Sequence, residues 1–222
     1  MPADGGWDTH RLSGSVGELH GRDPEPHASR QVWLMSPLDA ALVLGSAQRA
    51  EFAAGQSSGG LAVVRRRSGG GAVLLAPDDS VWIDVVIGRD DPLWEDDVNR
   101  APLWLGKAWA AALASLGIAG GEVFPRYQPG RWGRLACFAG RGPGEVLVER
   151  AKAVGISQRR TRTTARFQTL VYRRWEPEKL VDCLAVPPGQ LDEFRDAMSM
   201  TTWTVTALAE EIQAALVASL PQ

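Results

Sequence analysis

The order of the apolar runs along the chain constrains the fold more than any other sequence feature. Short strand-like runs fill the first half, and stretches with helical spacing fill the last third. Such a pattern is typical of an α+β domain. The chain has 222 residues, 45% of them hydrophobic, and neither an internal repeat nor a low-complexity block. This is the size of one ordinary globular domain, so we expect a single α+β domain over residues 11–222.

The apolar pattern also predicts where the strands and helices lie. The run at 81–87 does not alternate cleanly, so this strand is expected to be buried on both faces. Strands are expected at 32–35, 41–44, 61–66, 72–75, 81–87, 135–138, 145–148 and 167–172, and helices at 13–22, 101–116, 177–185, 190–198 and 201–220.

Two segments are expected to lack regular structure. Residues 1–10 are polar and contain glycine, which favours a disordered N-terminus. Residues 57–60 read Ser-Ser-Gly-Gly, which is typical of a loop.

Charge and cysteine content exclude several classes of protein. The net charge is −2, so no bulk attraction to nucleic acid is expected. Two cysteines are too few for a disulfide framework, and a reduced, cytoplasmic setting fits them best. Because no run approaches the length of a membrane span or of a signal-peptide core, no membrane role is expected.

The histidines and lysines are distributed unusually. All three histidines lie in the first 27 residues, which argues against Ser-His or Cys-His catalysis and against a histidine-bound metal. Only an N-terminal segment that folds back over a site would restore those possibilities, and no metal is expected. Lysine accounts for only three of the 24 basic residues, at Lys107, Lys152 and Lys179. A lysine in a conspicuous place is therefore a candidate for chemistry that arginine performs less well.

The first candidate motif is a glycine-rich turn between two apolar strands. It reads Arg-Arg-Arg-Ser-Gly-Gly-Gly-Ala-Val and includes Arg65, Arg66, Ser68 and the three glycines 69–71. Glycines allow the backbone to approach a ligand, with successive amides free to face an anion, and the arginines can grip phosphate or carboxylate. A flexible hairpin with a solvated basic edge has the same composition. The motif is not a P-loop, because Gly-Lys-Ser/Thr is absent.

The second motif begins at Lys152 and reads Lys-Ala-Val-Gly-Ile-Ser-Gln-Arg-Arg, with Gly155 and Ser157 inside it. An exposed basic hairpin is the alternative, but the scarcity of lysine favours a functional role for Lys152.

Cys137 is the third candidate, and it lies fifteen residues before Lys152. A lone cysteine beside a phenylalanine is usually a small buried hydrophobe. A nearby lysine would instead lower the pKa of the thiol and serve as its base. Cys183 lies in an apolar helical stretch and is expected to pack in the core.

These motifs together resemble the lipoate–protein ligase A family. The Arg65–Val73 segment is similar to its Arg-Arg-x-Ser-Gly-Gly-Gly-Ala-Val signature, and the Lys152–Arg160 segment to its Lys-hydrophobic-x-Gly-x-x-Gln-Arg-Arg segment. Residues 42–48 resemble the family's early strand that ends in Gly-x-x-Gln. The three motifs occur in the family's order over residues 40–175. The resemblance implies the biotin/lipoate ligase catalytic fold, a mixed sheet flanked by helices.

The resemblance also implies a reaction, the attachment of a lipoyl or octanoyl group to a lysine of a lipoyl domain or of the glycine cleavage H protein. In ligases, ATP with Mg²⁺ activates the acid as an acyl-adenylate. In the octanoyltransferase branch, a cysteine takes the acyl group from acyl carrier protein without a cofactor. By motif position, Lys152 would stabilise the adenylate phosphate or assist the thiol of Cys137. The groove for acyl and phosphate groups would be lined by Arg65, Arg66, Ser68, Gly69, Gly70, Gly71, Gly155 and Ser157.

The sequence departs from the family pattern at two places. Where the family has an aromatic residue followed by His-Asp, residues 74–79 read Leu-Leu-Ala-Pro-Asp-Asp. The family's later His-Gly is replaced by Phe167-Gln168 and the residues around them. The accessory C-terminal domain of many lipoate ligases is not expected. These departures are what an inactive homologue that binds a ligand or partner without turnover would show.

Overall fold

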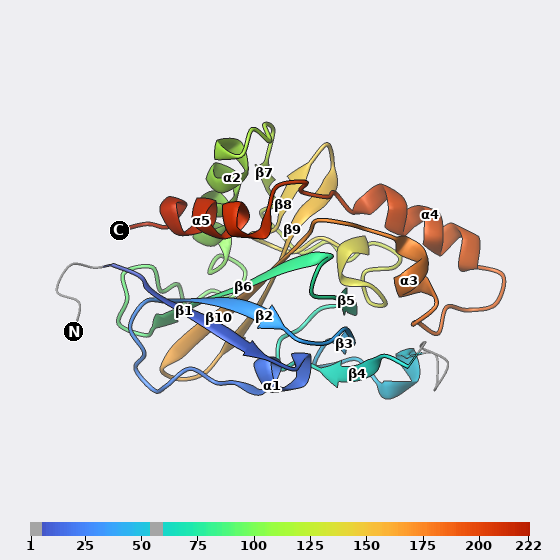
Figure 1. Cartoon of the computed structure of the whole chain (residues 1–222), viewed down its shortest axis with the longest axis horizontal. Coiled ribbons are helices and arrows are strands. Elements are labelled where there is room, and N and C mark those ends of the chain that lie inside the picture. Colours follow the sequence, from blue (N-terminus) through green and yellow to red (C-terminus); the bar gives the residue numbers. More distant parts are fainter. Residues whose placement is uncertain (1–5, 54–59) are drawn as a thin grey trace.

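A seven-stranded sheet organises the molecule, as the computed structural model shows for residues 6–53 and 60–222 (Figure 1). The strand order is β1–β2–β6–β10–β9–β8–β7. Strands β1 and β2 are parallel, and every other neighbouring pair is antiparallel, so the sheet is mixed. The strands are β1 (Asp8–Gly14), β2 (Gln31–Pro37), β6 (Ser80–Gly88), β7 (Glu122–Val123), β8 (Val146–Val148), β9 (Ala151–Arg160) and β10 (Thr164–Tyr172).

A small three-stranded sheet lies beside the large one and carries the glycine-rich turn. Its order is β4 (Ala62–Arg65), β3 (Ala41–Leu44) and β5 (Val73–Leu75). Strand β3 pairs in parallel with β4 and antiparallel with β5. The turn therefore joins the two outer strands across the end of β3.

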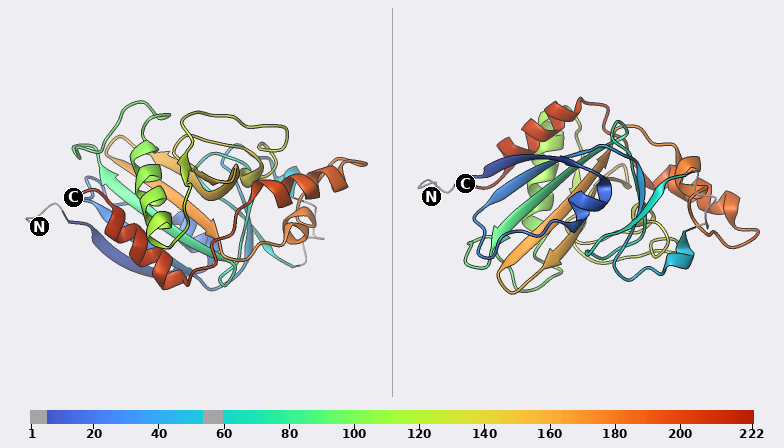
Figure 2. Two further views of the ribbon diagram at one scale, coloured as in Figure 1. Left: turned by 90° about the horizontal axis from the view of Figure 1, so that it is seen from above. Right: turned by 60° about the horizontal axis from the view of Figure 1, so that its bottom comes forward.

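Two helices cover one face of the large sheet. Figure 2 shows α2 (Leu103–Ser115) and α5 (Ala209–Ser219) lying across the same face. Their apolar sides pack on β6, β9 and β10 in one continuous cluster that includes Trp109, Phe167 and Ile212, all fully buried. This face is closed by hydrophobic packing.

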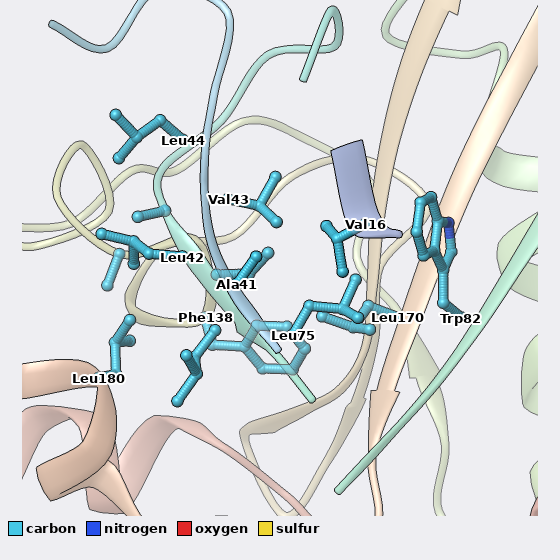
Figure 3. Packing of buried hydrophobic residues seen from close by; sticks show 14 of the residues in the cluster. Val16, Ala41, Leu42, Val43, Leu44, Leu75, Trp82, Phe138, Leu170 and Leu180 are labelled. Carbon is cyan, nitrogen blue, oxygen red and sulfur yellow. The ribbon is translucent and has the colours of Figure 1, made fainter. Parts of the chain in front are cut away.

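The opposite face is covered by α1 (Val16–Gly21), the small sheet, α3 (Pro177–Val181) and α4 (Leu191–Thr201). Figure 3 shows Leu75 and Phe138 beside Leu170 of the large sheet, while Leu42 of the small sheet extends toward the side on which Leu180 of α3 lies. A second apolar cluster thus fills the space between the two sheets.

Helix α1 is short, and its position is fixed at both ends. Ser15 and Glu18 form a capping box, and the Asp39 carboxylate accepts a hydrogen bond from the Val16 amide (2.7 Å). At the other end, the Arg166 guanidinium of β10 donates to the carbonyls of Leu19 (3.1 Å) and Arg22. A one-turn helix is marginal on its own, so these contacts hold α1 against the sheet.

The expected α+β class and mixed sheet are confirmed, and most predicted elements lie within a few residues of their observed bounds. Strand β6 is buried on both faces, as its pattern indicates. The helix expected at 13–22 begins later, because residues 13 and 14 belong to β1. Strands β1, β7 and β9 were not predicted, since each carries many polar residues or is very short.

Three expectations are wrong. Residues 8–10 of the expected disordered N-terminus lie in β1, paired with β2. Residues 135–138 form no strand, because Cys137–Ala139 close a one-turn 3₁₀ helix. The last helix begins at 209 rather than 201, since β-branched residues in 202–205 favour an extended chain that bridges to β9 and β10. Residues 1–5, and 57–59 of the expected loop, lie outside the described residues.

Candidate functional site

The glycine-rich turn packs tightly against its surroundings, which explains its composition. A Cβ on Gly71 would stand 2.7 Å from the Ala136 carbonyl carbon, and one on Gly45 only 1.9 Å from the Gly70 oxygen. Gly70 has a φ of +100°, which other residues rarely adopt. In the described part of the chain, the amides of residues 69–71 donate to no protein acceptor. Amides of this kind are available to an anion.

The three arginines before the turn are each held by a polar contact within the protein. The buried Arg66 guanidinium donates to the carbonyls of Gly69 (2.8 Å) and Gly71 (2.8 Å) and also reaches Val43. Arg65 donates to the carbonyls of Gly45 and Gln48, and Arg67 pairs with Asp23. Arg65 and Arg66 therefore shape the loop through backbone contacts.

Lys152 is buried and fully engaged. Its ammonium donates to Glu145 Oε1 (2.7 Å) and to the Cys137 carbonyl (2.7 Å), and it lies over the Phe138 ring. Burial raises the pKa of Glu145 above its ordinary value, and the positive charge of Lys152 opposes that shift. The ammonium is thus anchored directly behind the segment that carries the cysteine.

A β-bulge sets the direction of Lys152. In the pairing of β8 with β9, Val146 faces Val154 and Leu147 faces Lys152, so Ala153 is an extra residue. Without the bulge, Lys152 and Gly155 would point to opposite faces, because side chains alternate along a strand. With it, both face Phe138, whose ring lies 3.0 Å from the point where a Gly155 Cβ would stand.

Cys137 is half-buried, and both it and Arg66 line the pocket described below. The Arg66 Nη2 and the Cys137 Sγ lie 2.9 and 3.7 Å from the point where a Cβ on Gly70 would stand. The thiol is therefore next to a guanidinium charge. Cys183 is buried in the core, and its thiol donates to the Lys179 carbonyl, as expected for a packing residue.

A row of polar side chains crosses the sheet beside the cysteine. Gln168 of β10 faces Asp84 of β6 on one side and Ser157 of β9 on the other. The Ser68 hydroxyl donates to Gln168 Oε1 (2.6 Å) and lies 3.0 Å from the Ser157 hydroxyl. One step along the sheet, the row of Trp82, Leu170 and Gly155 is apolar.

His20 of helix α1 packs on the sheet at this row and contacts Gln168. Helix α1 places its ring over Trp82, with the ring centroids 4.2 Å apart, and its Nδ1 lies 3.2 Å from Gln168 Nε2. Burial and the nearby charges of Arg66 and Arg166 lower the pKa of His20 from 6.5 to about 3, so the ring is neutral at physiological pH. The N-terminal segment thus brings a histidine to the site, the one case that the histidine count left open.

These groups surround a pocket between the two sheets that contains about 370 Å³ of empty space, part of it open to solvent. The described residues that line it are mainly apolar, and Asp and Glu are absent from them. The lining consists of His20, Arg66, Val73, Trp82, Cys137, Phe138, Gly155, Ile156, Ser157, Gln168, Thr169 and Leu170.

The structure brings part of the set of sequence candidates together. Arg66, Cys137, Gly155 and Ser157 line the pocket, and Ser68 contacts Ser157. Lys152 lies behind Cys137, and the lining also does not include Arg65 or the three glycines 69–71. Sequence reasoning missed His20, Gln168 and Glu145, because their partners are distant in the chain and no local motif marks them.

Metal-ligating clusters and membrane-spanning helices are both absent from the described residues. Among the described residues, no cluster of three or more His, Cys, Asp or Glu side chains is arranged to hold a metal ion. In the same part of the chain, every helix is too short or too polar to cross a bilayer.

Comparison with solved structures places the fold. One match comes from the structural analysis of an archaeal lipoylation system, a bipartite lipoate protein ligase and its E2 lipoyl domain from Thermoplasma acidophilum. It has 17% identity and a TM-score of 0.75, and it covers 96% of this chain and 82% of that one. A lipoate-protein ligase A bound with ATP matches at 16% identity and a TM-score of 0.68, covering 96% and 83%. A T. acidophilum lipoate protein ligase with bound lipoic acid gives 15% identity, a TM-score of 0.69 and coverage of 96% and 83%.

Sequence comparison gives the family. No curated protein matches the chain significantly. The family model described as the lipoyl protein ligase A/B catalytic domain matches residues 19–219, which span the glycine-rich turn, Cys137 and Lys152. The chain therefore belongs to the lipoyl protein ligase A/B catalytic domain family.

Proposed function

We propose that this protein transfers a lipoyl or octanoyl group to a lysine of a lipoyl domain. One observation carries the proposal: a mainly apolar pocket is lined by Arg66 and Cys137, both of which lie close to Gly70 of the glycine-rich turn with its free amides, and Lys152 lies behind Cys137. An acyl chain fits the apolar walls, and the amides and the buried ammonium suit the charge that develops at its carbonyl end. Similarity to a structure from an archaeal lipoylation system, described as a lipoate protein ligase and its E2 lipoyl domain, supports a lipoyl domain as the acceptor.

The first route is activation by ATP to an acyl-adenylate. The free amides of the turn are suited to a phosphate, and a structural neighbour binds ATP. Lys152 would then stabilise the adenylate phosphate after exchanging its bond to Glu145 or to the Cys137 carbonyl. The residues present do not fit Mg²⁺ well, because the described lining of the pocket contains no carboxylate, and the buried carboxylates Glu145 and Asp84 are each already paired with a buried cation.

The second route uses Cys137, and the position of its Sγ favours it. The thiol lines the pocket beside the Arg66 guanidinium, and the Lys152 ammonium donates a hydrogen bond to the backbone carbonyl of Cys137. Cys137 would attack the thioester of octanoyl-acyl carrier protein, forming an octanoyl-cysteine thioester and releasing the carrier thiol, which takes up the proton. The acceptor lysine amine would then attack this thioester and release the Cys137 thiol. This route needs neither ATP nor a metal.

The partners and the compartment follow from these routes. Lipoyl domains, or the glycine cleavage H protein, would be the acceptors, and acyl carrier protein would be the donor in the second route. All are compatible with a cytoplasmic protein that has no role on membranes or nucleic acids.

A two-donor assay tests the proposal and separates the routes. The purified protein is incubated with an apo lipoyl domain and either lipoate plus ATP or octanoyl-acyl carrier protein, and all masses are measured intact. Product with lipoate and ATP alone supports the adenylate route. An octanoyl adduct on the enzyme without ATP, absent in Cys137→Ser and retained in Cys183→Ser, supports the cysteine route.

The same assay recognises an inactive homologue. In that case neither donor modifies the lipoyl domain, whereas calorimetry still detects binding of the acids. The internal pairing of Lys152 with Glu145 is the observation consistent with this outcome, which would overturn the proposal of acyl transfer.

A further inference from the structure

Asp23 holds two arginines that come from different parts of the chain. One oxygen of its carboxylate pairs with the Arg67 guanidinium, and the other lies 3.3 Å from Arg159 Nε. Arg67 directly precedes Ser68 of the glycine-rich turn, and Arg159 lies near the end of β9. The turn and the large sheet are therefore joined by an anion from a third segment, the residues that follow α1.

This contact lies next to residues of the candidate site. Because side chains alternate along a strand, Arg159 is on the same face of β9 as Ser157, which lines the pocket. Arg67 is the chain neighbour of Ser68, whose hydroxyl lies 3.0 Å from the hydroxyl of Ser157. The two arginines are thus the neighbours of two serines that contact each other.

The place between Arg67 and Arg159 suits an anion. Guanidinium groups are the usual partners of phosphate and carboxylate in proteins. Asp23 is the only acidic side chain that pairs with either arginine in the part of the chain that the structure describes. The amides of residues 69–71 in the adjoining turn are also free of protein acceptors there. Without Asp23, two positive charges beside these amides would be available to an anion from solution.

The Asp23 carboxylate is placed so that it can leave. The side chains of Asp23 and Arg67 are both 45% exposed, and ion pairs with this exposure are weak. Asp23 lies outside helices and strands, and its amide and carbonyl have no hydrogen bond to another described residue. The neighbouring Arg22 carbonyl is held by Arg166, so α1 need not move with Asp23. A competing anion can therefore reach the two arginines at low cost.

We propose that Asp23 is an autoinhibitory residue: its carboxylate occupies a phosphate position formed by Arg67 and Arg159, and a phosphate group of the acyl donor displaces it. The identity of the donor rests on the proposed function. In the first route the donor is ATP, and in the second the acyl group arrives on an arm that a phosphodiester attaches to the carrier protein. Both donors bring a phosphate. A ligand without phosphate leaves Asp23 in place.

Calorimetry on the whole chain tests the proposal without turnover, so a failure of acyl transfer does not affect the result. ATP and 4′-phosphopantetheine are each titrated into the wild type and into Asp23→Asn, which keeps the shape and removes the charge. We expect the variant to bind at least one probe about tenfold more tightly, the range of one hydrogen bond to a charged group. A gain for ATP alone identifies the nucleotide as the source of the phosphate, and a gain for phosphopantetheine alone identifies the carrier arm. Unchanged or weaker binding of both probes would overturn the proposal.

The two arginines are tested in the Asp23→Asn background. Arg67→Gln and Arg159→Gln should each remove the gain in affinity, because each takes away one of the charges that hold the phosphate. If the gain persists in both double variants, other groups bind the phosphate and the proposed position is wrong. Circular dichroism establishes that each variant is folded before the titrations.

Two controls separate this contact from the overall charge and from the rest of the ligand. Glu176→Gln removes one exposed carboxylate from another ion pair, 2.8 Å from Lys179, and should bind both probes as the wild type does. Adenosine, which has no phosphate, should bind equally to the wild type and to Asp23→Asn. A gain of the same size in Glu176→Gln, or with adenosine, would contradict displacement of Asp23 by a phosphate.

Discussion

The two faces of the seven-stranded sheet are closed in different ways. Helices α2 and α5 cover one face with a continuous apolar cluster around Trp109 and Ile212. The other face also has an apolar cluster, but buried charged and polar side chains, among them Lys152, Glu145, Arg166, Asp84 and His20, interrupt it. Buried charges cost free energy unless each is paired. The difference indicates that packing on the first face mainly stabilises the fold, whereas the second face has less apolar packing because it also contains the polar side chains of the site.

The sharpest test of this comparison is Lys152→Ala. Loss of the ammonium should lower acyl transfer to a lipoyl domain by roughly a hundredfold or more, as for removal of a group that stabilises developing charge. It also leaves Glu145 buried without its partner, which should lower the free energy of unfolding by about 3–5 kcal/mol. Both effects are measured on one preparation, by the transfer assay and by urea denaturation.

Two variants separate activity from stability in that test. The exposed Lys107→Ala should change neither quantity. The double variant Lys152→Met, Glu145→Leu replaces the buried pair by apolar side chains of similar size, so stability should largely return while transfer stays absent. Full transfer activity in Lys152→Ala would show that the polar face does not depend on this lysine.

A substitution on the other face should have the opposite profile. Leu113 is fully buried between α2 and the sheet, and Leu113→Ala should lower the free energy of unfolding by about 2–5 kcal/mol through the cavity it leaves. Binding of acyl ligands to the folded protein should change less than twofold, as calorimetry below the melting temperature would establish. A large loss of ligand affinity would mean that the two faces are coupled.

The pH dependence of stability gives the smallest expected effect. The folded-state pKa of His20 is lowered to about 3 from 6.5, so the unfolded chain binds more protons than the folded one between these values. Stability from His20 is therefore complete above pH 6.5 and lost as the pH falls. At pH 5 the loss should be about 2 kcal/mol. Urea denaturation at pH 7.5 and pH 5 should show this difference in the wild type and not in His20→Phe.

The apolar face could be predicted from sequence better than the polar one. The positions of helix α2 and strand β6 could be predicted from the spacing of their apolar residues alone. Strand β9 could not be predicted in this way, because its polar second half resembles an exposed hairpin. The burial of β9 depends on its pairing with β8 and β10. The motifs indicated Cys137 and Lys152. His20 and Glu145 could not be inferred, because their roles come from contacts set only by the folded chain.

The β-bulge at Ala153 makes the site sensitive to chain length in a way that side-chain identity does not reveal. Deleting this one alanine would allow β8 and β9 to pair without interruption, with nearly the same composition. The ammonium of Lys152 would then rotate through half a turn, away from the cysteine segment and toward the helices α2 and α5. Substitutions in β9 are therefore expected to be tolerated better than a change in its number of residues, which would reverse the direction of Lys152.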